Sequence, residues 1–475
     1  RFGDITAGNG CTYACMEEEG EESLIRCSLE GELSALHTSY DCYGSPALSP
    51  CGNKLAFLGW NLPHMPWERN DLLILDLTSG EATCVASGAS HFQPSWDENG
   101  TLFFTSDVSG YWNLYDERGK NLFPMEADFG EAQWTCGMSR YAHTPVGIAA
   151  IYTEKGVDSL ALLTDQLARI DLPFTAYRNL VASRSHLYFV AASPELPEAL
   201  YSYELKSETL KALRETSTLT CGAISLPEPF EFDSEGERAY GIYYPPQKPE
   251  DGPPPLIVRC HGGPTTHAKP LFDLRTQLLT SRGYAVVDIN YGGSTGYGKA
   301  YRNRLSGKWG IVDVADAIAG VRALIEAGKG DEARLCITGR SAGGFTALAA
   351  LAASPLFTCG ISWYGVSDLA ALAATTHRFE SGYLTTLIGS DPTLFTSRSP
   401  LANADAITAP LLLLQGSDDA VVPPEQTERL ARALRTRRLF VEVELFEGEG
   451  HGFRSSDAIE RAASAELTFL QKVFT

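Results

Sequence analysis

Three side chains in the second half of the sequence have the types and the order that acyl transfer through a hydroxyl group requires. Ser341 stands between glycines in GRSAGG, Asp419 lies in QGSDDAVV, and His451 stands between glycines in GEGHGF. A serine hydroxyl is a weak nucleophile until a histidine takes its proton, and the histidine needs a carboxylate to orient it. The sequence therefore contains a candidate nucleophile, a candidate orienting carboxylate and a candidate general base.

A turn rich in glycine surrounds Ser341 and leads directly into a run of small helix-forming residues. This is the G-x-S-x-G pattern, in which a strand turns sharply into a helix and holds the serine in a strained backbone conformation. Gly339, Ala342, Gly343 and Gly344 are small enough to leave room for such a turn. The amide of Ala342 would stand at the helix N-terminus, where developing negative charge is favoured. We therefore expect Ala342 to supply one donor of an oxyanion hole.

The acid and the base are each chosen between two positions downstream of Ser341. In sheets that carry this turn, the acid precedes the histidine along the chain. We favour Asp419 because it begins the turn-forming pattern D-x-x-V-P, whereas the neighbouring Asp418 is expected to cap or brace the loop. His451 follows a strand on a glycine-flanked loop, whereas His377 lies in a helix-like stretch. We therefore expect Asp419 and His451 to complete the site.

The loop HGGPTT, which follows the first apolar strand of this half, offers the second oxyanion donor. Glycines let backbone N–H groups approach a substrate oxygen closely. We expect the amide of Gly263 to fill this role, with that of Gly262 as the alternative. His261 is expected to brace the loop through local hydrogen bonds rather than to take part in the chemistry.

The elements around these residues alternate between apolar strands and amphipathic helices. This alternation predicts a doubly wound, mostly parallel sheet covered by helices on both faces, and with the serine turn it predicts an α/β hydrolase at residues 223–475. The expected strands cover residues 256–260, 284–291, 334–338, 359–365, 411–416 and 440–446, and the expected helices residues 313–328, 343–354, 424–436 and 457–474.

The first half, residues 1–222, has short strands separated by turn formers. Two stretches form a weak repeat, SPALSPCGNKLAFLGW and QPSWDENGTLFFTSD, each with proline, a spacer, a turn with glycine and an apolar strand. Such a repeat predicts a β-propeller, and this length allows about four or five blades. An antiparallel sandwich is the alternative. The clearest expected strands are residues 54–60, 71–77, 101–107, 186–193 and 199–205.

Charge and cysteine content restrict the classes of partner and compartment. The chain of 475 residues carries a net charge of −21, which disfavours nucleic acids and anionic membranes as partners. No apolar run is long enough to span a membrane. The 11 cysteines are scattered and predict free thiols in a reducing, cytoplasmic environment. Cys11 and Cys15 lack the further ligands that a metal site needs, so no metal is expected.

Several motifs in order resemble the prolyl oligopeptidase family, in its branch of acylaminoacyl peptidases and dipeptidyl aminopeptidases. They are HGGPTT, NYGGSTGYGKAY, GKWGIVDVADA, GRSAGGF, YGVSDL, QGSDDAVVPPEQ and FEGEGHGF. The resemblance implies a serine peptidase without metal or organic cofactor that acts on short or N-acylated peptides and can form homo-oligomers. It gives Ser341, Asp419 and His451 the roles assigned above, and it matches Gly263 and Ala342 to the oxyanion donors.

Two departures from the family bear on the substrate. Relatives have a longer propeller, usually of about seven blades, so this chain is expected to lack the first two or three. Dipeptidyl members hold the free amine of the substrate with acidic side chains, for which Glu380 is the candidate here. The acidic run MEEEGEE is interpreted as a solvated loop. A carboxylesterase of the same fold, or a propeller-based binding protein with an inactive hydrolase half, are the alternatives to a peptidase.

Overall fold

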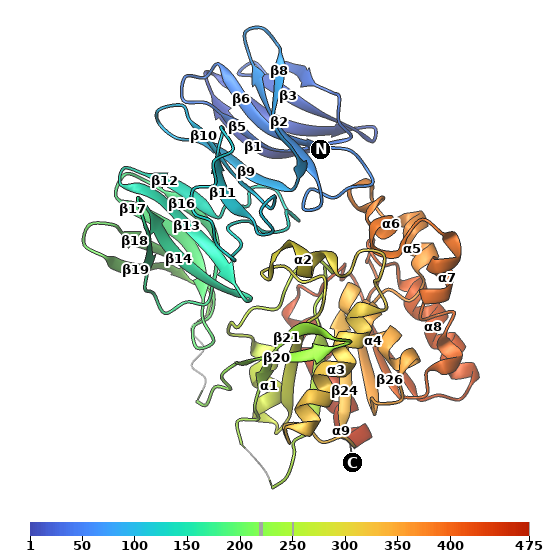
Figure 1. Cartoon of the computed structure of the whole chain (residues 1–475). Coiled ribbons are helices and arrows are strands. Elements are labelled where there is room, and N and C mark those ends of the chain that lie inside the picture. The colour runs from blue at the N-terminus through green and yellow to red at the C-terminus, as the bar shows by residue number, and fades with distance from the viewer. Residues whose placement is uncertain (218–221, 249–250, 475) are drawn as a thin grey trace. The chain divides into compact units, whose positions relative to one another are not determined.

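The computed structural model describes residues 1–217, 222–248 and 251–474, which fold into two compact units (Figure 1). The boundary expected between residues 222 and 223 falls beside residues 218–221, which lie outside the described residues. The sequence pattern did not predict that two short segments of the second half, Thr295–Ala300 and Arg378–Tyr383, belong to the first unit. The first unit contains Arg1–Thr218, Thr295–Ala300 and Arg378–Tyr383; the second contains Leu219–Ser294, Tyr301–His377 and Leu384–Thr475.

Five small antiparallel sheets make up the first unit and are the blades of a β-propeller. Consecutive strands pair within each blade because short turns connect them. The sandwich alternative is wrong, because the strands form separate small sheets. The blades are β1 (Phe2–Gly8), β2 (Cys11–Glu18), β3 (Glu21–Ser28) and β4 (Leu33–His37); β5 (Cys42–Leu48), β6 (Lys54–Trp60), β7 (Asn70–Asp76) and β8 (Ala82–Ala89); β9 (His91–Trp96), β10 (Leu102–Ser106) and β11 (Asn113–Asp116); β12 (Tyr141–Thr144), β13 (Gly147–Glu154), β14 (Val157–Leu163) and β15 (Leu167–Ile170); and β16 (Ala176–Ala182), β17 (His186–Ala192), β18 (Ala199–Glu204) and β19 (Thr209–Glu215).

Apolar side chains join neighbouring blades. Leu24 of the first blade packs in one buried cluster with Phe57 and Leu75 of the second. The weak sequence repeat corresponds to the first hairpins of two successive blades, since one copy contains the end of β5 with β6 and the other the end of β9 with β10. The repeat therefore predicted the blade pattern from a turn and one apolar strand.

A β-bulge recurs in the first strand of four blades. The residues Asp4, Ser45, Gln93 and Asn179 have φ angles of 46°, 52°, 50° and 56°, and the strand register shifts beside each of them. Left-handed backbone is uncommon for residues other than glycine, and a bulge is one place where it occurs. These bulges are a second repeat, one of backbone conformation rather than of residue type.

The two inserted segments are held in the first unit by specific contacts. The ammonium of Lys299 lies 3.0 Å from the Asp107 carboxylate, and the backbone amide of Lys299 donates to the carbonyl of Gly110 at 2.8 Å. In the other segment, the ring of Phe379 packs edge-on against Trp67, with 6.2 Å between centroids. The Arg378 guanidinium donates to the carbonyl of Asp41 at 2.9 Å.

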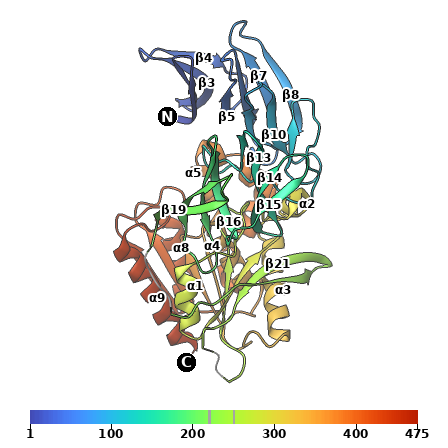
Figure 2. The same ribbon diagram turned by 90° about the vertical axis from the view of Figure 1, so that its left-hand side faces the viewer.

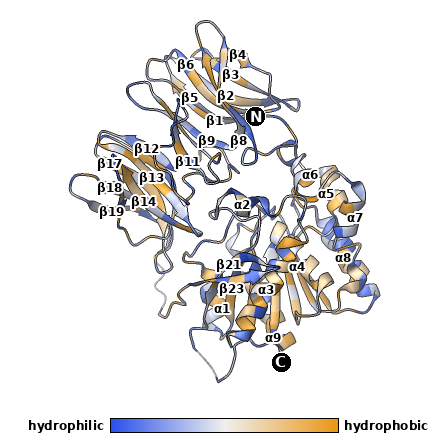
Figure 3. Cartoon of the chain, in the orientation of Figure 1, coloured by the Kyte–Doolittle hydropathy of each residue, from blue (hydrophilic) through white to orange (hydrophobic). Residues whose placement is uncertain are grey.

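An eight-stranded sheet forms the core of the second unit. Its strands lie in the order β20-β21-β23-β22-β24-β25-β26-β27, and the six strands from β23 to β27 are parallel. Strands such as β26 are buried along their whole length because helices cover both faces, and Figure 3 shows the hydrophobic interior of this unit. The bounds are β20 (Glu228–Ser234), β21 (Glu237–Tyr244), β22 (Leu256–Cys260), β23 (Ala285–Asn290), β24 (Leu335–Arg340), β25 (Cys359–Trp363), β26 (Leu411–Gly416) and β27 (Val441–Phe446).

Helices α1 and α9 cover one face of this sheet, and α3 and α4 cover the other (Figure 2). Leu279 of α1 and Phe469 of α9 share a buried cluster with Ile257, Ile361 and Leu412 of the strands. The bounds are α1 (Leu274–Ser281), α2 (Gly298–Asn303), α3 (Val312–Glu326), α4 (Ala342–Ala353), α5 (Leu369–Thr375), η1 (Arg378–Glu380), α6 (Tyr383–Ile388), α7 (Pro392–Arg398), η2 (Ala404–Ala406), α8 (Pro424–Thr436) and α9 (Ser456–Phe474).

A buried carboxylate joins α3 to α4. The hydroxyl of Thr346 donates to Asp313 at 2.5 Å, and the amide of Gly310 donates to the other oxygen of the same carboxylate at 2.7 Å. Burial raises the pKa of Asp313 to about 6, because desolvation disfavours the charged form. This contact fixes the helix that follows the serine turn.

The expected strands and helices of the second half are confirmed within a few residues at their ends. One feature was missed: β20 and β21, an antiparallel pair, precede the parallel strands. One expectation was wrong: His377 lies between α5 and η1 and not in a helix, because α5 ends at Thr375.

Candidate active site

Ser341 lies at the tip of a sharp turn between β24 and α4. Its φ of 53° and ψ of −120° are strained for a residue with a side chain. A Cβ atom on Gly339 would lie 2.1 Å from the carbonyl oxygen of Gly343, and one on Gly343 would lie 2.0 Å from the carbonyl oxygen of Cys260. Both positions therefore require glycine, which is the physical reason for the pattern around the serine.

A chain of hydrogen bonds connects Ser341, His451 and Asp419. Nε2 of His451 lies 2.9 Å from Oγ of Ser341, and Nδ1 of His451 lies 2.8 Å from Oδ2 of Asp419. With the proton on Nδ1 donated to the carboxylate, Nε2 is free to accept the proton of the serine hydroxyl. The three side chains come from the C-terminal ends of β24, β26 and β27, where sites in open α/β sheets are built.

The Asp419 carboxylate is fixed by its own loop. Its Oδ1 atom accepts the amides of Val421 and Val422, each at 2.9 Å, and its Oδ2 atom accepts the side-chain amide of Gln415 at 3.2 Å. The side chain is buried, whereas that of Asp418 is exposed and accepts the hydroxyl of Ser417. Of the two candidate carboxylates, Asp419 is the one beside His451.

The loop that carries His451 is held by Glu449. The carboxylate of Glu449 accepts the amide of Arg454 at 2.7 Å and both the amide and the hydroxyl of Ser455, at 3.0 and 2.5 Å. These hydrogen bonds favour the charged form and lower the pKa of Glu449 below its ordinary value. Sequence reasoning missed Glu449; its place two residues before the histidine was the available signal.

Tyr364 supports the imidazole from the side. Its ring lies edge-on to His451 with 4.9 Å between centroids, and it also contacts Phe453 at 5.6 Å. The amide of Tyr364 donates to the carbonyl of Leu414 at 2.7 Å, which fixes the end of β25 to β26. Tyr364 was also missed from the sequence.

The glycine loop expected to stabilise an oxyanion lies next to Ser341. A Cβ atom on Gly262 would lie 3.7 Å from Cβ of Ser341, and Gly263 has a φ of 114°, which side-chain-bearing residues rarely adopt. The hydroxyl of Thr266 donates to the carbonyl of Gly262 at 2.8 Å. The amide of Ala342 belongs to the first turn of α4, whose N–H groups have no acceptor within the helix.

His261 holds this loop from behind. Its Nδ1 atom donates to the Gly262 carbonyl at 2.9 Å, and its Nε2 atom lies 2.7 Å from the hydroxyl of Ser294. The ring stacks on Tyr291 with 4.2 Å between centroids. Burial lowers the pKa of His261 to about 4, so the ring is neutral around pH 7.

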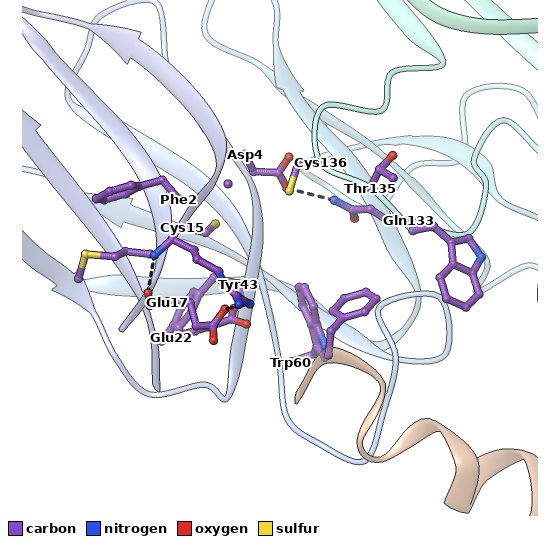
Figure 4. A pocket seen from close by; sticks show the side chains of 15 residues that line it. Phe2, Asp4, Cys15, Glu17, Glu22, Tyr43, Trp60, Gln133, Thr135 and Cys136 are labelled. Carbon is purple, nitrogen blue, oxygen red and sulfur yellow. Dashed lines mark hydrogen bonds and ion pairs between the residues drawn. The ribbon is translucent and has the colours of Figure 1, made fainter. Parts of the chain in front are cut away.

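Glu380 belongs to the first unit, in η1, next to a cavity of about 260 Å³ to which its neighbour Phe379 contributes. Glu380 itself does not line this cavity, whereas Asp4 and Glu22 do (Figure 4). The acidic run MEEEGEE forms the end of the hairpin between β2 and β3, and Glu18, Glu19 and Glu21 are exposed, as expected of a solvated segment. Glu22 differs, because it is half-buried and accepts the amide of Tyr43 at 3.0 Å. Burial raises the pKa of Glu22.

Within the described ranges, no three His, Cys, Asp or Glu side chains gather in a way that would hold a metal ion. The described cysteines are all free thiols. No helix in the part of the chain that the structure describes is long and apolar enough to cross a membrane.

Comparison with solved structures gives a match over the whole length. A puromycin-hydrolyzing peptidase of Mycobacterium tuberculosis is 35% identical with a TM-score of 0.95, and the match covers 100% of this chain and 78% of that one. The chain belongs to the prolyl oligopeptidase family. The model of that family matches residues 270–475. The family contains serine peptidases with an N-terminal propeller and a C-terminal hydrolase unit, as expected from the sequence motifs.

Two curated members of the family carry different names for their activities. The chain is 31% identical to dipeptidyl aminopeptidase BIII of Pseudoxanthomonas mexicana, over 55% of this chain and 41% of that one. It is 30% identical to the acylamino-acid-releasing enzyme of Arabidopsis thaliana, over 42% of this chain and 27% of that one. The chain therefore spans less than half the length of these curated relatives.

Proposed function

We propose that this member of the family is a serine peptidase that cleaves short peptides or N-acylated peptides near their N-terminus. The observation that carries the proposal is the hydrogen-bond chain from the Ser341 hydroxyl through His451 to Asp419. This arrangement activates a hydroxyl for attack on a carbonyl carbon, and the site needs no cofactor for that step.

In the first half of the proposed reaction, Oγ of Ser341 attacks the scissile carbonyl while Nε2 of His451 takes the hydroxyl proton. The carbonyl π electrons move to its oxygen, and the amides of Gly263 and Ala342 stabilise the resulting oxyanion. Asp419 stabilises the imidazolium that forms. The tetrahedral intermediate then collapses, the C–N bond breaks, and the imidazolium gives its proton to the leaving amine.

In the second half, water hydrolyses the ester that now joins the acyl group to Ser341. His451 takes a proton from the water as it attacks the ester carbonyl, and the same two amides stabilise the second oxyanion. Collapse breaks the bond to Oγ, and the imidazolium returns the proton to the serine. The acyl product leaves as a carboxylic acid, and the site is restored.

The names of the relatives leave the substrate N-terminus open between a free amine and an acyl group. A panel of nitroanilides tests this: N-acetyl-aminoacyl, dipeptidyl and free aminoacyl derivatives of the same amino acid, beside a nitrophenyl ester. Each is assayed with the full chain and with Ser341→Ala. We expect amide cleavage that Ser341→Ala reduces by a factor of about 10³ or more, as for the loss of an activated nucleophile.

The panel also separates the alternatives. Ester cleavage without amide cleavage would favour a carboxylesterase of this fold. Amide cleavage that persists in Ser341→Ala would contradict the assigned nucleophile. An absence of both activities would favour a binding protein whose hydrolase half is inactive.

A cytoplasmic location and a homo-oligomer are further proposals. Free cysteines such as the buried Cys260 and Cys336 are typical of proteins from reducing compartments. Fractionation of the source cells tests the location, and sedimentation of the purified chain tests the oligomeric state.

A further inference from the structure

A cavity of about 400 Å³ in the second unit adjoins the residues of the active site. This is within the range of about 300–1,000 Å³ typical of small-molecule sites. Arg340, directly before Ser341, lines it, as does Phe453, two residues after His451. The other lining residues are Leu274, Arg275, Leu278, Trp363, Tyr364, Gly452, Ile459, Glu460 and Ala463.

The sheet and two helices create this cavity. Side chains alternate between the faces of a strand, so Arg340 shares a face of β24 with Cys336, which packs toward α1 and α9. Trp363 shares the corresponding face of β25 with Ile361. The first two turns of α1 and of α9 provide the other walls. The cavity thus lies at the C-terminal edge of the sheet, on the face covered by these two helices.

Two neighbouring arginines have carboxylate partners. Arg275 binds Glu466 through its Nε atom at 2.8 Å and through a second, shorter hydrogen bond. Arg259 binds Asp288 through two hydrogen bonds, at 2.7 and 2.6 Å, and Asp273 through a third at 2.6 Å. These three carboxylates are therefore already paired with Arg275 and Arg259 and are not available to a third guanidinium.

Arg340 is that third guanidinium. It lies over the ring of Trp363 at 5.0 Å, and within the described residues it forms no ion pair or hydrogen bond through its side chain. Surrounding protein atoms and the positive charge of Arg275 lower the pKa of Arg340 below its ordinary value. Part of the side chain is nevertheless exposed, so a ligand can reach it. An anion bound there would gain a charge-assisted hydrogen bond.

Apart from Arg340, Arg275 and Glu460, the residues that line the cavity are mostly aliphatic or aromatic. Leu274 and Ile459 are 53% and 51% exposed, although large aliphatic side chains are usually buried. Trp363 and Phe453 form an aromatic wall with 5.7 Å between centroids. Glu460 also lines the cavity but makes no ion pair with Arg340 among the described residues. A ligand that suits this lining has an apolar body and one carboxylate.

The position beside His451 indicates which part of a substrate would enter. In the proposed reaction His451 protonates the leaving amine, so the leaving peptide must begin within hydrogen-bond reach of its Nε2 atom. Tyr364 contacts the imidazole of His451 and also lines the cavity. The cavity therefore lies next to the imidazole that faces the leaving amine in the proposed reaction.

We propose that this cavity binds a leaving peptide of one or two residues, with its C-terminal carboxylate on the Arg340 guanidinium and its apolar side chain against Trp363 and Phe453. The inference rests on the proposed peptidase function and adds a substrate class to it: short peptides that end in a free carboxylate soon after the scissile bond.

Binding to the full-length Ser341→Ala variant tests the inference without catalysis. The probes are the dipeptide phenylalanyl-leucine and its C-terminal amide, measured by titration calorimetry. Loss of one charge-assisted hydrogen bond corresponds to roughly 10-fold to 100-fold in affinity. We expect the free acid to bind at least about 10-fold more tightly than the amide. Equal affinities would overturn the proposal.

Variants assign the preference to the cavity. In the Ser341→Ala background, Arg340→Gln should remove the preference for the free acid, and Arg340→Lys should retain part of it. Ile459→Glu, an exposed change on the opposite wall, should also weaken binding of the acid, and it tests the proposal if the Arg340 variants do not fold. Arg432→Gln, an exposed arginine on α8, is the matched control. A preference that survives both Arg340→Gln and Ile459→Glu would contradict the proposal.

Kinetics separates this inference from the proposed function. The acyl group that is cleaved best in the nitroanilide panel is coupled to phenylalanine and to phenylalanine amide. The active chain is assayed with both substrates, and their kcat/KM values are compared. Cleavage of both substrates at equal rates would support the peptidase and overturn the carboxylate site. Cleavage of neither would contradict the peptidase, while the calorimetric comparison would still report on the cavity.

Discussion

Glu449 accepts both the amide and the hydroxyl of Ser455 and so closes the loop between them, with His451 inside it. Glutamine has the same shape as glutamate but would place an N–H group opposite one set of these donors. We expect Glu449→Gln to lower kcat by roughly 10-fold to 100-fold through a small displacement of the imidazole. Steady-state kinetics measures this, with the exposed Glu447→Gln as the matched control. An unchanged kcat would show that the loop holds its shape without Glu449.

Asp419→Asn tests the orienting carboxylate. The asparagine amide would donate to Nδ1 of His451, so the ring proton would move to Nε2. A protonated Nε2 atom cannot accept the proton of the serine hydroxyl. We expect kcat to fall by roughly 10³-fold to 10⁴-fold while the unfolding temperature changes little. Asp418→Asn, one residue away and exposed, should retain nearly full activity. The reverse ranking of the two variants would reassign the acid to Asp418.

His261 should make stability depend on pH. Its folded pKa of about 4 lies below the ordinary 6.5, so between these pH values the unfolded chain binds a proton that the folded chain does not. The stabilisation is therefore complete above pH 6.5 and declines as the pH falls towards 4, by at most about 3 kcal/mol, and less where water reaches the ring. Denaturant unfolding of His261→Asn should show a smaller loss on acidification than the unmodified chain, whereas the exposed His64→Asn should not.

Asp313 should have the opposite effect. Its folded pKa of about 6 lies above the ordinary 3.8, so the folded chain holds a proton that the unfolded chain has released. The stabilisation is complete below pH 3.8 and is lost as the pH rises through 6, by about 3 kcal/mol at most. Asp313→Asn should remove this loss, as measured by the difference in unfolding free energy between pH 4 and pH 7. A parallel shift at both pH values would contradict the raised pKa; Asp405→Asn, at an exposed site, is the control.

The second half could be predicted in detail because its signals are local. A turn such as the one at Ser341 is dictated by backbone clashes at Gly339 and Gly343, and these are visible as glycines in the sequence. Apolar runs such as residues 411–416 indicate strands that are covered on both faces. Asp419 could be chosen over Asp418 because the turn pattern after it was visible.

What could not be predicted depends on partners distant in the sequence. Glu449 is one acidic residue among several, and its role appears only when the loop brings the Ser455 donors to it. Left-handed residues such as Gln93 have no sequence signature, because the bulge around them is fixed by strand pairing. Arg340 looked like a spacer in the serine motif until the neighbouring carboxylates proved to be bound by other arginines.

The two inserted segments have a consequence for dividing the gene. A fragment that starts at residue 223 would carry Phe379 away from Trp67 and Lys299 away from Asp107, the partners that these residues have in the first unit. A fragment that ends at residue 222 would leave those partners uncovered. The first unit therefore consists of three separate stretches of sequence. An exchange of this unit with that of a relative has to move all three stretches together.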